Sequence, residues 1–397
     1  MKASKRAKEI RYGIRELISL AREISKETGE KIISLASGDP VKYGFSPPKE
    51  FLESLVEATS YDINSYGNFA GEDILRRELA KLESSKTKRK INSDDLLITA
   101  GSIEAISAIF LSFFEPGDKV LLPDPYYPPY ASLARLHGLI PIFYPLREEE
   151  GWSIDINFLE FIIRKERPKG IVIINPNNPT GTILSRSLIE EIIDLAGEYN
   201  ILPIFDEVYD EIVFDGNFEK AANLTSDIPI IVLNSLSKTF AIPGWRIGYV
   251  YKIDEEGVLS DAWRGLKKVL MLRISNPRIT QIAAALALNK LNRSSYLEKY
   301  RRELNERRKF AIEMLSSFNH LTFVEPLGAF YIFPRITSGK WVKKDEELVL
   351  ELLKKEKVLI VHGSAFGKLG ISHIRLVFLP PKEIMEIALK KLKKVLG

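Results

Sequence analysis

The stretch Gly170-Ile-Val-Ile-Ile-Asn-Pro-Asn-Asn-Pro-Thr-Gly181 joins an apolar run of strand character to a turn rich in proline and asparagine. A helical pattern follows at about residues 185–199, and a second apolar run occupies residues 201–205. Strands that alternate with helices favour parallel pairing, because a crossover helix separates parallel neighbours along the chain. This unit predicts an α/β fold.

The same alternation extends to both sides of this unit. Apolar runs typical of buried strands recur at residues 96–100, 119–122, 228–233 and 247–251. Helical patterns follow two of them, at residues 101–114 and up to residue 137. We therefore expect a large domain at residues 43–289, with a mostly parallel central sheet covered by helices on both faces.

The two ends of the chain have a different pattern. Residues 1–42 predict a helix and a short connection, and long helical patterns occupy residues 255–289 and 296–317. Short strands are expected at residues 329–333, 358–361 and 373–378, between further helices. Both termini, residues 1–42 and 290–397, are expected to form a smaller α+β domain.

Composition excludes several classes of function. The 397 residues carry 57 Lys and Arg against 53 Asp and Glu, a net charge of +4 that is too balanced for a dedicated nucleic-acid surface. No cysteine is present, which removes disulfides, thiolate metal sites and cysteine nucleophiles. The four histidines lack metal-ligand spacing, so no metal is expected. No apolar run has membrane-spanning length and no signal peptide is visible, so we expect a cytoplasmic enzyme.

The segment Ser235-Leu-Ser-Lys-Thr-Phe-Ala-Ile-Pro-Gly-Trp-Arg246 places a lysine between two serines and an arginine. A lysine amine can form a C=N bond with a carbonyl cofactor. Serine hydroxyls and an arginine fork can hold a phosphate group. One segment could therefore hold both ends of pyridoxal phosphate, although the same residue types also occur on solvated surfaces.

Polar residues follow the neighbouring apolar runs. Asp206 and Tyr209 come at the end of one run, and Asn178 lies in the turn after another. Ligands of open α/β sheets bind at this carboxyl end of the strands, so these side chains are candidates for one site. Glu207 is expected to face elsewhere.

Together these three segments resemble the fold-type I pyridoxal-phosphate aminotransferases of class I. The resemblance covers about residues 10–381, and it is closest to the archaeal-type alanine aminotransferase subgroup. That subgroup is indicated by Ser37-Gly-Asp-Pro-Val-Lys-Tyr-Gly-Phe-Ser-Pro47 near the start. It is also indicated by Val361-His-Gly-Ser-Ala-Phe-Gly367 and His373-Ile-Arg-Leu-Val-Phe-Leu-Pro-Pro381 near the end.

The resemblance implies a role for each candidate residue. Lys238 carries pyridoxal phosphate and moves a proton between the substrate Cα and the cofactor C4′, while Asp206 keeps the pyridine nitrogen protonated. Tyr209 and Asn178 bond to the cofactor's 3′ oxygen, and Tyr127 stacks on its ring. The phosphate is expected to be held by Gly101, Ser102, Ile103, Ser235, Ser237 and Arg246.

The resemblance also assigns substrate contacts. Arg375 binds the α-carboxylate, with Asn178 beside it, and Gly38 lines the approach. Tyr12, near Arg15, matches a tyrosine that closes over small substrates. Tyr66 matches a tyrosine that reaches the phosphate of a neighbouring subunit, which implies a homodimer with composite sites. The alternative for Tyr66 is a loop tyrosine packed under the following helix.

The roles of two arginines remain open. Arg273 and Arg278 lie in a segment that often makes contacts between subunits in the family. Arg278 is expected either to bind a second carboxylate, on glutamate or 2-oxoglutarate, or to be a surface charge.

The sequence thus predicts an aminotransferase that moves the amino group between L-alanine and 2-oxoglutarate by a ping-pong mechanism. Its partners would be amino acids and 2-oxo acids, with neither nucleic acid nor membrane. One alternative is an aminotransferase for aspartate or aromatic amino acids. Another is a pyridoxal-phosphate carbon–sulfur lyase on the same fold. A third is a non-catalytic regulatory module that binds the cofactor, for which the segment before Ser37 is too short to supply the usual DNA-binding domain.

Overall fold

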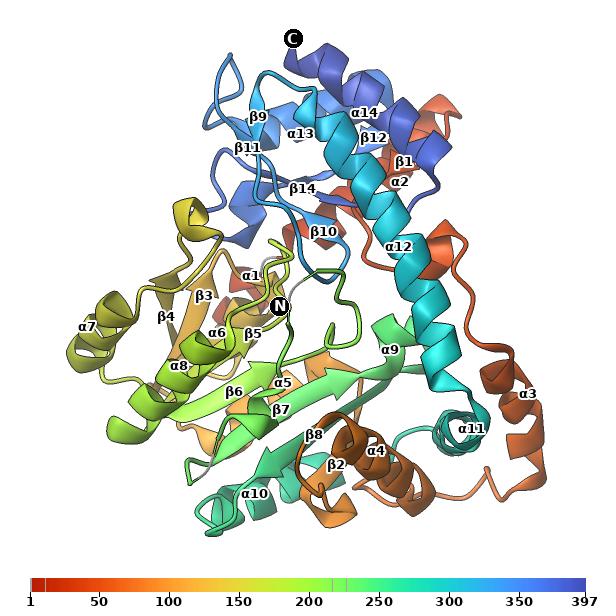
Figure 1. Cartoon of the computed structure of the whole chain (residues 1–397), viewed down its shortest axis with the longest axis vertical. Coiled ribbons are helices and arrows are strands. Elements are labelled where there is room, and N and C mark those ends of the chain that lie inside the picture. Colours follow the sequence, from red (N-terminus) through yellow and green to blue (C-terminus); the bar gives the residue numbers. More distant parts are fainter. Residues whose placement is uncertain (1, 11, 216, 226) are drawn as a thin grey trace.

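The computed structural model describes residues 2–10, 12–215, 217–225 and 227–397. Its centre is a seven-stranded sheet in the order β2-β8-β7-β6-β5-β3-β4 (Figure 1). These strands are β2 (Leu96–Ala100), β3 (Lys119–Asp124), β4 (Ile140–Pro145), β5 (Gly170–Ile174), β6 (Leu202–Asp206), β7 (Ile230–Ser235) and β8 (Ile247–Ile253). Strand β8 runs antiparallel to both of its neighbours, β2 and β7, and the other pairs of this sheet are parallel. The mostly parallel α/β sheet is confirmed.

Helices cover both faces of this sheet. The first group is α5 (Ser102–Phe113), α6 (Pro128–Leu136) and α10 (Ser260–Met271), which pack on one another behind the sheet in Figure 1. The second group, α7 (Ile156–Glu166) and α8 (Arg186–Glu198), lies on the opposite face. Every residue of β5 is buried as a result, which is why this strand is apolar throughout instead of alternating.

Strand β4 was not among the expected strands. It contains Pro141 and Pro145, which cannot donate backbone hydrogen bonds to a neighbouring strand. The structure places β4 at the edge of the sheet, paired only with β3. Prolines are tolerated in such a strand because its outer side needs no donors.

The continuous helix expected at residues 255–289 was a wrong prediction. The structure has two helices there, α10 and α11 (Arg278–Lys290), separated by residues 272–277. Pro277 caps α11, and a residue before proline avoids the helical conformation. Within the break, Ile274 takes a φ of 71°, in the left-handed region that ends helices.

Elements from both ends of the chain lie together, above the large sheet in Figure 1. Strand β1 (Ile33–Ser34) pairs in parallel with β12 (Val358–Leu359), and α2 (Gly13–Thr28) packs on β12 and β13 (Val361–His362). A three-stranded sheet of β10 (Tyr331–Ile332), β14 (Ile374–Val377) and β13 carries Arg375. The N-terminal part is two helices and not one, because α1 (Lys5–Glu9) precedes α2.

The remaining elements complete these two groups. Beside the large sheet lie α3 (Lys49–Glu57), α4 (Asp73–Lys86) and the short α9 (Leu236–Thr239). The upper group also contains β9 (Leu321–Thr322), β11 (Arg335–Ile336), α13 (Asp345–Glu356) and α14 (Lys382–Leu396).

The long helix α12 (Arg293–Ser316) connects the two groups of elements, running from the end of α11 towards β9 (Figure 1). It has 24 residues and is rich in arginine and glutamate. Across the described ranges, no helix combines the length and the apolar character that crossing a bilayer requires.

Candidate functional site

A cavity of about 510 Å³ opens where strands β5, β6 and β7 end. Parallel strands bring their carboxyl ends to one edge of a sheet, so residues that follow different strands meet there. The cavity collects most of the expected site residues: Tyr12, Gly38, Ser102, Ile103, Tyr127, Asn178, Asp206, Tyr209, Ser235, Ser237, Lys238, Arg246 and Arg375.

Lys238 lies in the short helix α9, which starts immediately after β7 and is capped by the Ser235 side chain. Its Nζ donates a hydrogen bond of 2.6 Å to the carbonyl oxygen of Gly38. Burial lowers the pKa of Lys238 to about 8, assisted by Arg246 and Arg375 and opposed by Asp39. About a tenth of the amine is therefore unprotonated at pH 7, far more than for an ordinary lysine.

One end of the cavity is built to hold an anion. Ser235 Oγ lies 2.8 Å from Ser237 Oγ, and the Arg246 guanidinium donates to the carbonyl of Ala100 at 2.9 Å. The first turn of α5, with its free backbone N–H groups, faces the same space through Ser102. Hydroxyls, a guanidinium and a helix start together match a phosphate dianion.

Gly101 contributes to this end without lining the cavity. Its φ is 78°, and a Cβ atom at this position would lie 2.0 Å from Nη2 of Arg246. Any larger residue would therefore displace the guanidinium or strain the backbone. Glycine is what allows Arg246 to lie beside the start of α5.

Asp206 is the last residue of β6 and is 6% exposed. Its carboxylate accepts a 2.7 Å hydrogen bond from the Tyr130 hydroxyl and one of 3.2 Å from the Val208 backbone N–H. Burial raises the pKa of Asp206 to about 6, partly offset by these donors. The carboxylate is ionised at neutral pH and favours a protonated partner in the cavity.

Two tyrosine pairs form further walls of the cavity. The hydroxyls of Tyr209 and Tyr331 lie 2.7 Å apart, and those of Tyr12 and Tyr127 lie 3.1 Å apart. Burial raises the pKa of Tyr127 and of Tyr209 well above the ordinary value, so both phenols stay protonated. Tyr12 comes from the segment before α2 and approaches the Tyr127 ring edge-on.

Arg375 provides a buried cation in the same cavity, with only 2% of the residue exposed. One terminal nitrogen donates to Asn178 Oδ1 at 3.1 Å, and the other donates to the Ala36 carbonyl at 2.6 Å. Its guanidinium lies 4.6 Å from the centre of the Tyr331 ring. Within the described residues its Nε is buried and has no hydrogen-bond partner.

The sequence reasoning missed two tyrosines of this site. Tyr130, the partner of Asp206, closes the same proline-rich string that contains Tyr127. Tyr331, the partner of Tyr209, lies in a strand that was expected, but 122 residues further along the chain. Both tyrosines are visible in the sequence, but which side chains they bond to depends on the fold.

Besides Gly101, three further expected positions lie outside the cavity wall. Tyr66 is 81% exposed and does not line the cavity of its own chain. Arg278 contacts Glu72 at 3.0 Å and Asp62 at 3.2 Å, so it is engaged within this chain at the surface. Arg273 donates to the Ile98 carbonyl at 2.6 Å. Of the two roles considered for Arg278, the surface charge agrees with these contacts.

Comparison with known proteins gives consistent results. The family model described as aminotransferase class I and II matches residues 30–392. The glutamate-pyruvate aminotransferase AlaA of Haemophilus influenzae is 31% identical, over 94% of this chain and 92% of the relative. The aspartate aminotransferase of Pyrococcus horikoshii is 33% identical, over 97% and 95%. The solved structure of an alanine aminotransferase from Pyrococcus furiosus matches with a TM-score of 0.93 and 40% identity, covering 99% of each chain.

These matches extend over nearly the whole chain and include the segments that build the cavity. The chain therefore belongs to the class I and II aminotransferases and is a pyridoxal-phosphate-dependent enzyme of that family.

Proposed function

We propose that this enzyme exchanges amino groups between L-alanine and 2-oxoglutarate. The main support is that Arg375 and Arg15, in addition to Arg246 at the phosphate end, line the same cavity as Lys238. Glutamate and 2-oxoglutarate carry two carboxylates and match two cations, whereas alanine needs only one. The names of the Haemophilus and Pyrococcus furiosus relatives support alanine. The name of the Pyrococcus horikoshii relative makes aspartate the competing amino donor.

The residues of the cavity fit pyridoxal phosphate. Ser235, Ser237 and Arg246 would hold its phosphate, together with the backbone at the start of α5. Asp206 would pair with the ring nitrogen, and Tyr209 and Asn178 would bond to the 3′ oxygen. The guanidinium of Arg375, which lines the cavity, would bind the carboxylate of a substrate. Each polar end of the cofactor thus has a partner of complementary charge or hydrogen-bonding type.

The protein's own groups have separate tasks in this proposal. Bound pyridoxal phosphate supplies an electron sink for the electron pair released when the Cα–H bond breaks. Lys238 Nζ would take the Cα proton and deliver it to the C4′ carbon of the bound cofactor, which the lowered pKa of this amine allows. Asp206 holds a proton on the ring nitrogen, and Arg375 fixes the substrate carboxylate so that the Cα–H bond faces Lys238.

An equilibrium test uses the holoenzyme with each substrate alone. L-Alanine should abolish the visible absorption of the bound cofactor and release one equivalent of pyruvate, and 2-oxoglutarate should then restore the band and form glutamate. Steady-state rates should give parallel double-reciprocal lines, because the enzyme keeps the amino group between the two half-reactions. Loss of the band with aspartate but not alanine would reassign the amino donor. Intersecting lines would contradict the ping-pong scheme.

We also propose that the active unit is a homodimer. Tyr66 is 81% exposed, and the nearby surface has exposed apolar side chains such as Leu272 at 87% and Ile274 at 51%. Such residues are usually covered by a partner when they gather on one face. Light scattering should give about 90 kDa, twice the chain mass of 45.1 kDa, across micromolar concentrations. A mass near that of one chain, in an active preparation, would contradict this proposal.

A further inference from the structure

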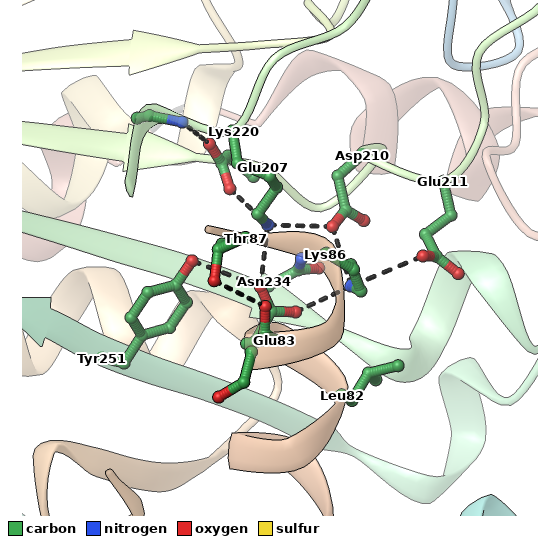
Figure 2. A network of polar contacts seen from close by, with 12 residues as sticks. Leu82, Glu83, Lys86, Thr87, Glu207, Asp210, Glu211, Lys220, Asn234 and Tyr251 are labelled. Atoms are coloured by element: carbon green, nitrogen blue, oxygen red, sulfur yellow. Dashed lines mark hydrogen bonds and ion pairs between the residues drawn. The ribbon is translucent and has the colours of Figure 1, made fainter. Parts of the chain in front are cut away.

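The turn that follows β6 presents two different faces. At residues 206–211, the side chains of Asp206 and Tyr209 line the cofactor cavity. The carboxylates of Glu207 and Asp210 belong to a buried ionic cluster beside the sheet (Figure 2). A displacement of Glu207 or Asp210 would therefore move Asp206 or Tyr209, because each of these pairs is joined by a single peptide bond.

Lys220 is the central cation of this cluster. Its Nζ lies 2.9 Å from Glu83, 2.5 Å from Glu207 and 2.9 Å from Asp210. Lys86 Nζ contacts the same Glu83 at 2.7 Å and the same Asp210 at 2.9 Å. The Lys220 side chain is 5% exposed and its three partner side chains are 2% exposed or less. Two acids of the turn are thus held against Glu83 by shared ammonium groups.

Glu83 attaches this arrangement to rigid elements. It lies on α4, and its carboxylate accepts hydrogen bonds from Tyr249 at 2.7 Å and from Tyr251 at 3.2 Å, both on β8. Glu207 is held a second time, by the backbone N–H of Ala221 at 2.9 Å. The cluster therefore connects the turn to helix α4 and to β8, an interior strand of the large sheet (Figure 2).

The charges of the cluster nearly balance. The cluster contains four carboxylates and three cations. The carboxylates are those of Glu83, Glu207, Asp210 and Glu211, and the cations are Lys86, Lys220 and Arg293. Burial by itself would lower the pKa of Lys220, but Asp210, Glu207 and Glu83 raise it well above its ordinary value, so the amine stays charged. Removing the charge of Lys220 would leave Glu83 and Asp210 to share Lys86, and would take from Glu207 its contact with a cation.

We propose that Lys220 is a positioning residue, which through Glu207 and Asp210 holds the turn so that Asp206 and Tyr209 meet the cofactor ring. This inference rests on the proposed roles of Asp206 and Tyr209. Lys220 is not among the residues that line the cavity, so it acts only through the turn. Its loss would loosen the contact of Asp206 with the ring nitrogen without removing any group that touches the cofactor.

The test compares holoenzyme carrying Lys220→Met with the natural chain. We expect the pH midpoint of the visible cofactor band to shift by about half a unit or more, and the Kd for pyridoxal phosphate to rise about tenfold, as loss of outer support does at other sites. The kcat should fall while the KM for 2-oxoglutarate changes little, because Arg15 and Arg375 are untouched. Adding Glu207→Gln to Lys220→Met should move the midpoint back, since it removes one of the uncompensated carboxylates.

Lys252→Met is the matched control. Lys252 is also a lysine with little exposure, its side chain being 10% exposed, and it pairs with Asp254 at 2.8 Å, but it lies near the end of β8 away from the cavity. The Lys252→Met variant should have a lower melting temperature, but the pH midpoint of its cofactor band and its Kd for pyridoxal phosphate should be unchanged. If Lys220→Met behaves in the same way, with only its stability altered, the positioning role is overturned.

Two further variants keep the outcome decisive. If Lys220→Met does not fold, Glu207→Gln provides the same test. It removes the charge that pairs with Lys220 but keeps a side-chain oxygen that can accept the hydrogen bond from the Ala221 N–H. An unchanged midpoint in this variant would overturn the inference. Asp206→Asn tests the proposed function separately: if it leaves the midpoint unchanged, Asp206 does not contact the ring and the proposed site is at fault, not the cluster.

Discussion

Replacing Lys238 with alanine lowers kcat/KM for L-alanine by at least about 10⁴-fold, because one change removes both the covalent attachment point and the group that moves the Cα proton. The phosphate end, built by Ser235 and Arg246, is unchanged, so pyridoxal phosphate still binds by non-covalent contacts. The visible band of the lysine-linked cofactor should disappear, and borohydride should no longer attach the cofactor to the protein. Lys42→Ala, at a second lysine lining the cavity, is the control and should keep the band.

The lowered pKa of Lys238 predicts that cofactor capture and apoenzyme stability both depend on pH. With the pKa of Lys238 at about 8, the unprotonated fraction grows about tenfold per pH unit below that value. The rate constant for capture of pyridoxal phosphate by the apoenzyme should therefore rise up to about pH 8 and then level off. Because the folded pKa lies below the ordinary 10.5, the unfolded chain binds more protons between these values, and the apoenzyme should gain stability as pH rises from about 8 to about 10.5. A capture rate that is flat below pH 8 would contradict a lysine nucleophile with this pKa.

The site could be located from the sequence because its residues follow strands. Asp206 ends β6 and Ser235 ends β7, and any parallel sheet brings such positions to one edge. Arg375 was harder to assign to this site, because it comes from a separate small sheet. Only the resemblance to a family connected it with Asp206 and Ser235. Which phenols pair with Asp206 and Tyr209 depends on side chains from distant elements, so spacing along the chain carries no signal for it.

The errors in the fold have a common physical cause. Periodicity reports which residues face an apolar neighbour, and it continues across residues 255–289 although the backbone turns between α10 and α11. Pro277 was a local stop signal that this reasoning did not apply. Strand β4 was not expected at all. Its two prolines argue against a strand, yet the edge of a sheet accepts them.

The ionic cluster was beyond sequence reasoning. Lys220 stands in a polar segment that has the composition of a solvated loop, and Glu83 lies on a helix far from it along the chain. Only the orientation of Glu207 away from the cavity was expected, and the structure agrees with it. A buried charge pairs with whatever the tertiary fold brings near, so burial of Lys220 cannot be read from its neighbours in sequence.

Arg375→Lys should reduce kcat/KM for L-alanine by about 30- to 5,000-fold, the range for truncating one member of a buried charge pair. Lysine keeps the positive charge but not the planar fork, so it cannot donate to Asn178 and Ala36 while also binding a carboxylate in two places. The affinity for pyridoxal phosphate should stay within a few-fold, because the phosphate and ring contacts lie on other residues. Isotope-exchange half-reactions with alanine and fluorescence titration with the cofactor measure the two quantities separately.

The control for this change is Arg335→Lys, at an arginine that is 47% exposed, pairs with Glu148 at 3.3 Å and lies outside the cavity. It should leave both quantities unchanged, since an exposed ion pair contributes little. If Arg375→Lys loses the cofactor as well as the substrate, then the bonds to Asn178 and Ala36 matter chiefly for holding the cavity together. If the Arg375→Lys variant keeps its full kcat/KM, the substrate carboxylate must bind elsewhere. Arg15 is then the first residue to examine, because it lines the cavity near Lys238 and has no role at the phosphate end.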